Sequence, residues 1–179
     1  MGDFKMGSKT VMSQSGTSNP TWGANAPTGS LIDYDLTNIT TNVNTSSSGG
    51  TPDIASSTAI SITLPAGSTS IITASGGKLF GSVGTTRSYS CALISYTTDG
   101  TTPSSSSNLI YGGLAAQVSP PGSNISVGIV EGKVVNSTGS DQTLKWNWGV
   151  VGSSALDGQW ETEAGANGNI SLKTLIFKD

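Results

Sequence analysis

The apolar residues of this chain are gathered in short runs that alternate with polar residues, and this pattern limits the fold more than any other feature. In residues 59–64, Ile60, Ile62 and Leu64 fall on one side of an extended backbone and hydroxyl side chains on the other. A period of two residues is that of a β-strand with one buried face. Roughly eight to ten such runs, about 8–12 residues apart, predict an all-β fold, an antiparallel β-sandwich of the jelly-roll type.

The composition favours strands and turns over helices. Gly, Ser and Thr make up roughly two-fifths of the chain and charged residues 11%, against about 25% in a typical soluble domain. Glycine supplies turn conformations and threonine fits a pleated surface, whereas the strong helix formers are scarce. Disorder is the competing interpretation of a chain rich in Ser and Gly. The gathering of apolar residues into alternating runs favours a packed core instead.

Two segments are predicted to lie at the centre of the sandwich. In residues 144–150, Leu144, Trp146, Trp148 and Val150 share one face, so we expect this strand to anchor the core. Residues 87–96 carry apolar side chains on both faces. That pattern is typical of a central strand with both faces covered.

The first strand of the head is expected at residues 30–36. Simple alternation places Ile32, Tyr34 and Leu36 together on one face, and Asp33 and Asp35 on the other. Two carboxylates on one face could ligate Ca²⁺ together with a loop carbonyl. The spacing of a calcium-binding loop is missing, however, so we predict no metal site.

Glycines set three further expectations for the strands. Ser75-Gly76-Gly77 predicts a turn that ends a strand at residues 70–74 and separates it from a shorter strand at 78–83. Gly128 and Gly132, inside the strand predicted at 126–135, predict bulges or close approaches of another backbone or side chain. Asp99-Gly100, at the start of a Ser-rich loop, predicts a turn.

The chain is expected to divide into an extended N-terminal arm, residues 1–25, and a β-sandwich head, residues 26–179. The arm is polar and interrupted by glycines, with too few apolar residues for a core of its own. Such a segment orders by docking on a partner or on sister chains. The expected particle or intersubunit contacts are the five large apolar residues of the arm, Phe4, Met6, Val11, Met12 and Trp22.

The residue content argues against an enzyme. The chain has no histidine, which removes imidazole-based triads and metal sites, and its one cysteine, Cys91, is expected to be a small buried thiol. We predict no catalytic residue, no cofactor and no metal. Eight scattered basic residues and a net charge of −3 predict no nucleic-acid partner, and the lack of a long apolar stretch or a signal sequence predicts no membrane association.

One acidic segment keeps a binding role open. Asp157, Glu161 and Glu163 surround Trp160, and an aromatic ring beside acids is the arrangement of a sugar site. A solvated acidic face is the favoured interpretation. Trp160 is the possible glycan contact of the chain, although a position in the core or between subunits is favoured for so large a ring.

The N-terminal segment Lys9–Gly23 carries an apolar pair, a Ser/Gly stretch and the motif Pro20-x-Trp22. This sequence resembles the N-terminal segments of bacteriophage fibre and head-surface proteins, and Ala26–Ile32 resembles the Pro-x-Gly entry into the globular domain of a fibre. The resemblance implies a virion protein assembled in the host cytoplasm. Its arm would attach to the major capsid protein or another virion protein, and its head would project, commonly as a homotrimer.

Two other functions stay open on the sequence. One is a phage tail-fibre or receptor-binding tip whose loops, at residues 97–108 and 152–168, bind host surface glycans. The other is a secreted carbohydrate-binding or adhesin module, which the missing signal sequence disfavours. The short chain favours a capsid decoration or head-fibre protein over both.

Overall fold

The computed structural model describes residues 3–13, 21–22, 26–39, 44–47, 50–55, 59–81, 88–117, 126–152, 158–162 and 169–179. These residues contain no helix, and all their paired strands are antiparallel. The predicted all-β antiparallel sandwich is confirmed. No helix long and apolar enough to cross a membrane occurs in this described part of the chain.

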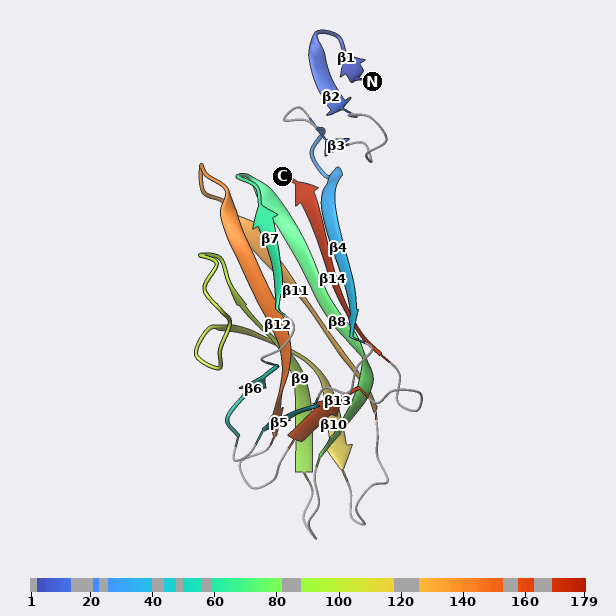
Figure 1. Ribbon diagram of the computed structural model, residues 1–179, viewed down its shortest axis with the longest axis vertical. Coiled ribbons are helices and arrows are strands. Elements are labelled where there is room, and N and C mark those ends of the chain that lie inside the picture. Colours follow the sequence, from blue (N-terminus) through green and yellow to red (C-terminus); the bar gives the residue numbers. More distant parts are fainter. Residues whose placement is uncertain are drawn as a thin grey trace.

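Two packed sheets form the head (Figure 1). The sheet that we call the β8 sheet contains, in spatial order, β4 (Leu31–Ile39), β14 (Ile170–Lys178), β8 (Ser68–Gly81) and β11 (Ser126–Asn136). The β12 sheet contains β7 (Ile60–Leu64), β12 (Gln142–Gly152), β9 (Ser88–Thr97) and β10 (Asn108–Gln117). In sequence order these eight strands alternate between the two sheets except for β9 and β10, which are neighbours within the β12 sheet, and this is the order of a jelly roll, as expected.

Shorter strands extend both sheets. In the β12 sheet, β6 (Asp53–Ile54) pairs with β12 beyond the end of β7. In the β8 sheet, β13 (Gly158–Glu161) pairs with β8 beyond the end of β14, and β5 (Asn44–Ser47) pairs with β13. These additions lie at the end of the head that is far from both termini in Figure 1.

The core lies between the inner faces of the two sheets and is anchored by β12. Leu144, Trp146, Trp148 and Val150 are all fully buried, which confirms the predicted face. The indole Nε1 of Trp146 donates a hydrogen bond to Oγ1 of the buried Thr174 at 2.9 Å. Since Thr174 belongs to β14, this bond joins the two sheets through the interior.

Strand β9 is central, as predicted. It pairs with β10 on one side and β12 on the other. The run Ala92, Leu93, Ile94 and Ser95 is buried on both faces of the strand. Ala92 and Ile94 belong to the core cluster on the inner side of the sheet. Leu93 lies between them in the strand and so points to the outer side, where it is also buried.

The predicted turn at Ser75-Gly76-Gly77 is wrong, because residues 70–74 and the described residues of the second predicted strand, 78–81, belong to the single long strand β8. Gly76 and Gly77 have positive φ angles of 104° and 62° and form a bulge within it. A Cβ at Gly76 would lie 2.1 Å from the carbonyl oxygen of Asn169, so a side chain does not fit. The bulge shifts the alternation by one residue: Ile72 and Ala74 face the core before it, and Leu79 after it.

A second bulge changes the predicted faces of β4. The register with β14 shifts between Ile176 and Phe177, so Ile32 packs against the core while Tyr34 and Leu36 are exposed. The predicted grouping of Ile32 with Tyr34 and Leu36 is therefore wrong.

Asp33 and Asp35 share one face of β4, as expected. Across the strand pair they lie opposite the core residues Ile176 and Thr174 of β14. No group of three or more potential metal-ligating side chains occurs among the described residues. Strand β4 is an edge of the β8 sheet. Charged side chains on the inward-facing side of an edge strand hinder pairing with another chain, which gives this acidic pair a structural role.

The N-terminal residues form a small sheet of their own. It contains β1 (Phe4–Met6), β2 (Lys9–Ser13) and β3 (Thr21–Trp22), in that order. In Figure 1 this sheet lies beyond the end of the head that carries the C-terminus, with β3 next to the start of β4. The segment predicted as an arm is thus strand-paired.

Replacing Trp148 with alanine should lower the free energy of unfolding by about 3–5 kcal/mol, because a fully buried indole would leave a cavity between the sheets. Its Nε1 has no hydrogen-bond partner in the described structure, so Trp148→Phe should cost much less. Thr143→Ala, at an exposed site of the same strand, is the control. Urea unfolding followed by circular dichroism measures all three, and an unchanged midpoint for Trp148→Ala would contradict the assigned core.

Candidate binding surfaces

Trp160, the candidate glycan contact, is fully buried, and this corrects the sugar-binding hypothesis for its ring. Its Nε1 donates to the carbonyl oxygen of Gly76 at 2.9 Å, and its ring meets that of Trp148 edge to face, with centroids 5.2 Å apart. The Cα of Gly128 on β11 lies so close that a Cβ there would be 2.4 Å from the indole. The close approach predicted for Gly128 is confirmed, as is the core position favoured for Trp160.

The acidic residues around Trp160 are separated by the structure. Glu161 forms an ion pair with Lys78 of β8 at 3.6 Å, on the outer side of the strand that buries Trp160. Asp157 and Glu163 lie outside the described residues. The described part of this segment therefore offers an ion-paired carboxylate and a buried ring.

The Ser-rich loop between β9 and β10 is held by its own hydrogen bonds. The backbone N–H and the hydroxyl of Thr101 donate to Oδ1 of Asp99 at 2.9 and 2.7 Å, and Gly100 has a φ of 79°, which confirms the predicted turn. These bonds, the hydroxyl bond first, lower the pKa of Asp99. The hydroxyl of buried Ser95 donates to the carbonyl of Ser104 at 2.7 Å. The loop is thus fixed at both its start and its middle.

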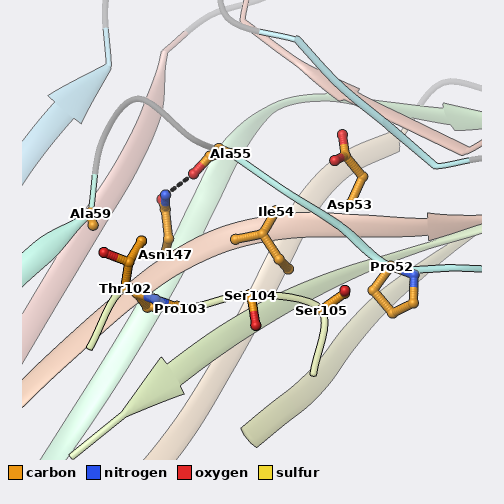
Figure 2. A pocket seen from close by; sticks show the side chains of 10 residues that line it. All are labelled: Pro52, Asp53, Ile54, Ala55, Ala59, Thr102, Pro103, Ser104, Ser105 and Asn147. Carbon is orange, nitrogen blue, oxygen red and sulfur yellow. Dashed lines mark hydrogen bonds between the residues drawn. The ribbon is translucent and has the colours of Figure 1, made fainter. Parts of the chain in front are cut away.

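A cleft of about 300 Å³ lies between this loop and the segment that contains β6. Figure 2 shows Ile54 pointing toward the loop and Asp53 pointing to the opposite side of its segment. The walls are mainly apolar, with hydroxyl groups from the loop; the lining residues are Pro52, Asp53, Ile54, Ala55, Ala59, Thr102, Pro103, Ser104, Ser105 and Asn147.

The polar groups of the cleft are largely engaged within the protein. The amide nitrogen of buried Asn147 donates to the carbonyl of Ala55, and its Oδ1 accepts from the N–H of Trp148 at 2.9 Å. The Ser104 hydroxyl bonds with those of Ser106 and Ser107. The cleft therefore suits an uncharged ligand that has an apolar face, and the sequence reasoning had identified only its loop.

The end of the head nearest the N-terminal sheet is tied together by Asn136. Its buried side-chain nitrogen donates to the carbonyl of Leu64 at 2.8 Å, and its oxygen accepts from the N–H of Thr138 at 3.0 Å. Beside it, the N–H of Asp179 donates to the carbonyl of Gly67 at 3.1 Å. The β7–β8 turn, the β11–β12 turn and the C-terminus are thereby joined into a firm base below the N-terminal sheet.

The five apolar residues expected in the arm are distributed over all three strands of the N-terminal sheet. Phe4 and Met6 belong to β1, Val11 and Met12 to β2, and Trp22 to β3. Met6 is 61% exposed and Met12 is half-buried. Met12 pairs with Phe4 on one side and Trp22 on the other, which brings three of the five residues to one row of the sheet.

The outer face of the β8 sheet carries large apolar side chains that the sequence analysis did not single out. Leu31, Tyr34 and Leu36 of β4 are exposed there, and so are Val127, Ile129 and Val135 of β11. Half-buried side chains of β14 and β8, namely Leu175, Phe177 and Ile71, lie between these two edges. The pairing of the strands was needed to find this face, because the bulge in β4 hides it in the sequence.

Comparisons with known proteins give this chain no family. No protein-family model matches it, and no curated protein matches it.

Cys91 is half-buried on β9, and its Sγ–H contacts the carbonyl oxygens of Ala92 and Gly112 at 3.4 and 3.5 Å. Burial raises the pKa of the thiol, and the contact with Gly112 opposes this to a smaller extent. Less thiolate is therefore present at a given pH than for a free cysteine.

We expect iodoacetamide to alkylate Cys91 more slowly in the folded chain than in the urea-unfolded chain at pH 8, because both the raised pKa and the partial burial reduce the reactive thiolate. The rate should go on rising with pH beyond the range in which the unfolded chain reaches its plateau. Mass spectrometry of timed samples measures both rates. Equal rates for the two states would contradict the position of the thiol.

Proposed function

We propose that this chain is a non-enzymatic structural protein of a bacteriophage virion, a capsid decoration or head-fibre protein. Residues 1–25 attach to the major capsid protein or another virion protein, and the β head projects from the particle. Copies of the chain associate as a homo-oligomer, a trimer by the resemblance of the N-terminal motif. Assembly takes place in the host cytoplasm.

The observation that carries this proposal is the separation of the N-terminal sheet from the head. The small sheet has its own strand pairing, lies beyond one end of the head, and presents the large apolar side chain of Met6 to solvent (Figure 1). Its strands have only three, five and two residues, and so small a unit has little apolar surface to bury within itself. Such a segment gains stability from a surface on which it docks, which is what an attachment segment requires.

The fold and the residue content agree with a structural role. Jelly rolls are used by viral capsid proteins and lectins among others, an argument by analogy that leaves function to the sites. The chain contains no histidine, so imidazole-based catalysis is not available to it. Six large apolar side chains of the described head are exposed on the outer face of the β8 sheet, where they can contribute buried area to a contact.

A protein of this kind would work through repeated weak contacts. Each attachment segment needs only modest affinity, because the neighbouring copies in an oligomer hold it at a high effective concentration over a symmetric shell. The hydrogen bonds around Asn136 would keep this end of the head rigid, so that attachment of the N-terminal segment would also orient the head.

Electron microscopy of intact phage particles from cells that produce the chain tests the proposal. A tagged head should appear at regular positions on the capsid surface. Its absence from purified particles would contradict a virion role.

Deleting residues 1–25 should leave the head folded and abolish attachment, because the core lies entirely between the two sheets of the head. Circular dichroism and the unfolding midpoint check the fold, and co-sedimentation with particles that lack the chain checks attachment. The full-length chain is the control. Equal attachment by the truncated chain would overturn the role of the N-terminal segment.

A glycan-binding tip is the second candidate, and the cleft beside the loop at residues 98–107 is the observation that favours it. The apolar wall would contact the face of a sugar ring, and the loop hydroxyls its edge. Ser105 lines the cleft and Ser106 does not.

Ser105→Trp should therefore reduce glycan binding by at least about tenfold by filling the cleft, while Ser106→Trp should not. A glycan array with the labelled full-length chain measures this. Failure of the unmodified chain to bind any glycan, or equal loss in both variants, would remove this candidate.

A further inference from the structure

The outer face of the β8 sheet has the composition of an interface. Tyr34 and Leu36 on β4 are 62% and 54% exposed, and Ile129 on β11 is 55% exposed. Of the eight large apolar residues that are exposed in the described chain, six lie on the two outer strands of this sheet. Large exposed apolar side chains that gather on one face of a domain mark an interaction site.

The strand register shows which residues lie side by side in rows across this face. One row runs from Leu36 of β4 through Lys173 of β14 and Thr73 of β8 to Glu131 of β11. The next row along β8 contains Tyr34, Leu175, Ile71 and Lys133, and the row after that Leu31, Phe177, Thr69 and Val135.

On this outer face, oppositely charged side chains lie on the two sides of β8. Lys173 is on the β14 side and Glu131 on the β11 side of Thr73, whose hydroxyl donates to Glu131 Oε2 at 3.2 Å. Two strand spacings, about 9–10 Å of backbone, separate the lysine from the glutamate. Among the described residues Lys78 forms an ion pair with Glu161, and no carboxylate lies within ion-pair distance of Lys173.

We propose that this face is covered by the same face of another copy of the chain. A rotation axis that runs parallel to the strands, above the space between β14 and β8, sets β4 of one copy against β11 of the next and β14 against β8. The exposed apolar side chains of both outer strands are then covered, and Lys173 lies one strand spacing from Glu131 of the next copy. The contact thus joins opposite charges and buries apolar side chains from both sides of the face, as a self-complementary interface requires.

The size of the face agrees with a contact between copies. Four strands spaced about 4.8 Å apart, each about nine residues long, give the face an area on the order of 600 Å² per copy. A standard stable interface buries about 800 Å² per partner, so this contact is at the small end and should be reversible. The same exchange of sides holds around a two-fold and a three-fold axis, and the mass of the oligomer decides between them.

This inference rests on the homo-oligomer that the proposed function contains, but it needs no virion. It is tested on the purified full-length chain without particles. Self-association and particle attachment are then separate results, and either can fail without the other.

The experiment is a charge exchange across the proposed contact, followed by sedimentation velocity at concentrations up to about 100 µM, where a contact of micromolar affinity is saturated. Lys173→Glu and Glu131→Lys each set like charges against one another, and each should weaken self-association by at least about tenfold. The double variant restores opposite charges and should recover most of the loss. Association should also weaken with added salt.

Lys145→Glu is the matched control, because it makes the same charge change on the outer side of β12 in the other sheet. It should leave association unchanged. Circular dichroism and the unfolding midpoint establish that each variant is folded, as expected for changes at side chains outside the core.

Three results would overturn the inference: an unmodified chain that stays monomeric at the highest concentration, single variants that associate as strongly as the unmodified chain, or a double variant no better than either single one. A monomeric chain whose face variants lose only particle attachment would assign the face to a capsid protein instead.

Discussion

The contacts of Trp160 hold the far end of the sandwich together, and several other features depend on them. Its ring reaches from β13 in one sheet to Trp148 in the other, while its Nε1 is bonded to the backbone of the β8 bulge. An indole buried with its N–H satisfied stabilises the core without a polar cost. The space for it exists only because residue 128 is a glycine.

The bulges in β8 and β4 determine which side chains of these strands are buried and which are exposed. In β8 the Gly76-Gly77 bulge lets one strand pair first with β14 and then with β13 while keeping Ile72 and Leu79 in the core. In β4 the bulge turns Ile32 inward and leaves Tyr34 and Leu36 outside. Strand register determines the exposed residues as strictly as it determines the core, because a shift by one residue would move every side chain of a strand to the other face.

Sequence reasoning succeeded where the two-residue period was unbroken and failed where a bulge interrupted it. The faces of β12 could be predicted, because Leu144 to Val150 alternate without interruption and contain two tryptophans. The faces of β4 could not, since the extra residue is defined by the pairing with β14 rather than by local composition. Trp160 has acidic neighbours in sequence, yet its burial depends on Gly76 and Gly128, which are remote along the chain.

The acidic pair on β4 and the apolar outer face together restrict how copies of this chain can meet. Pairing along an open strand edge repeats without limit and leads to extended aggregates. Asp33 and Asp35 lie on the same side of β4 as the core residues of β14, and a second copy paired along that edge would bring further carboxylates close to them. In the proposed contact through the outer face, rotation symmetry fixes the number of copies, because the copies around the axis cover each other's outer faces. The proposed contact would therefore let a chain with 11% charged residues expose apolar side chains on its outer face and still form a finite assembly.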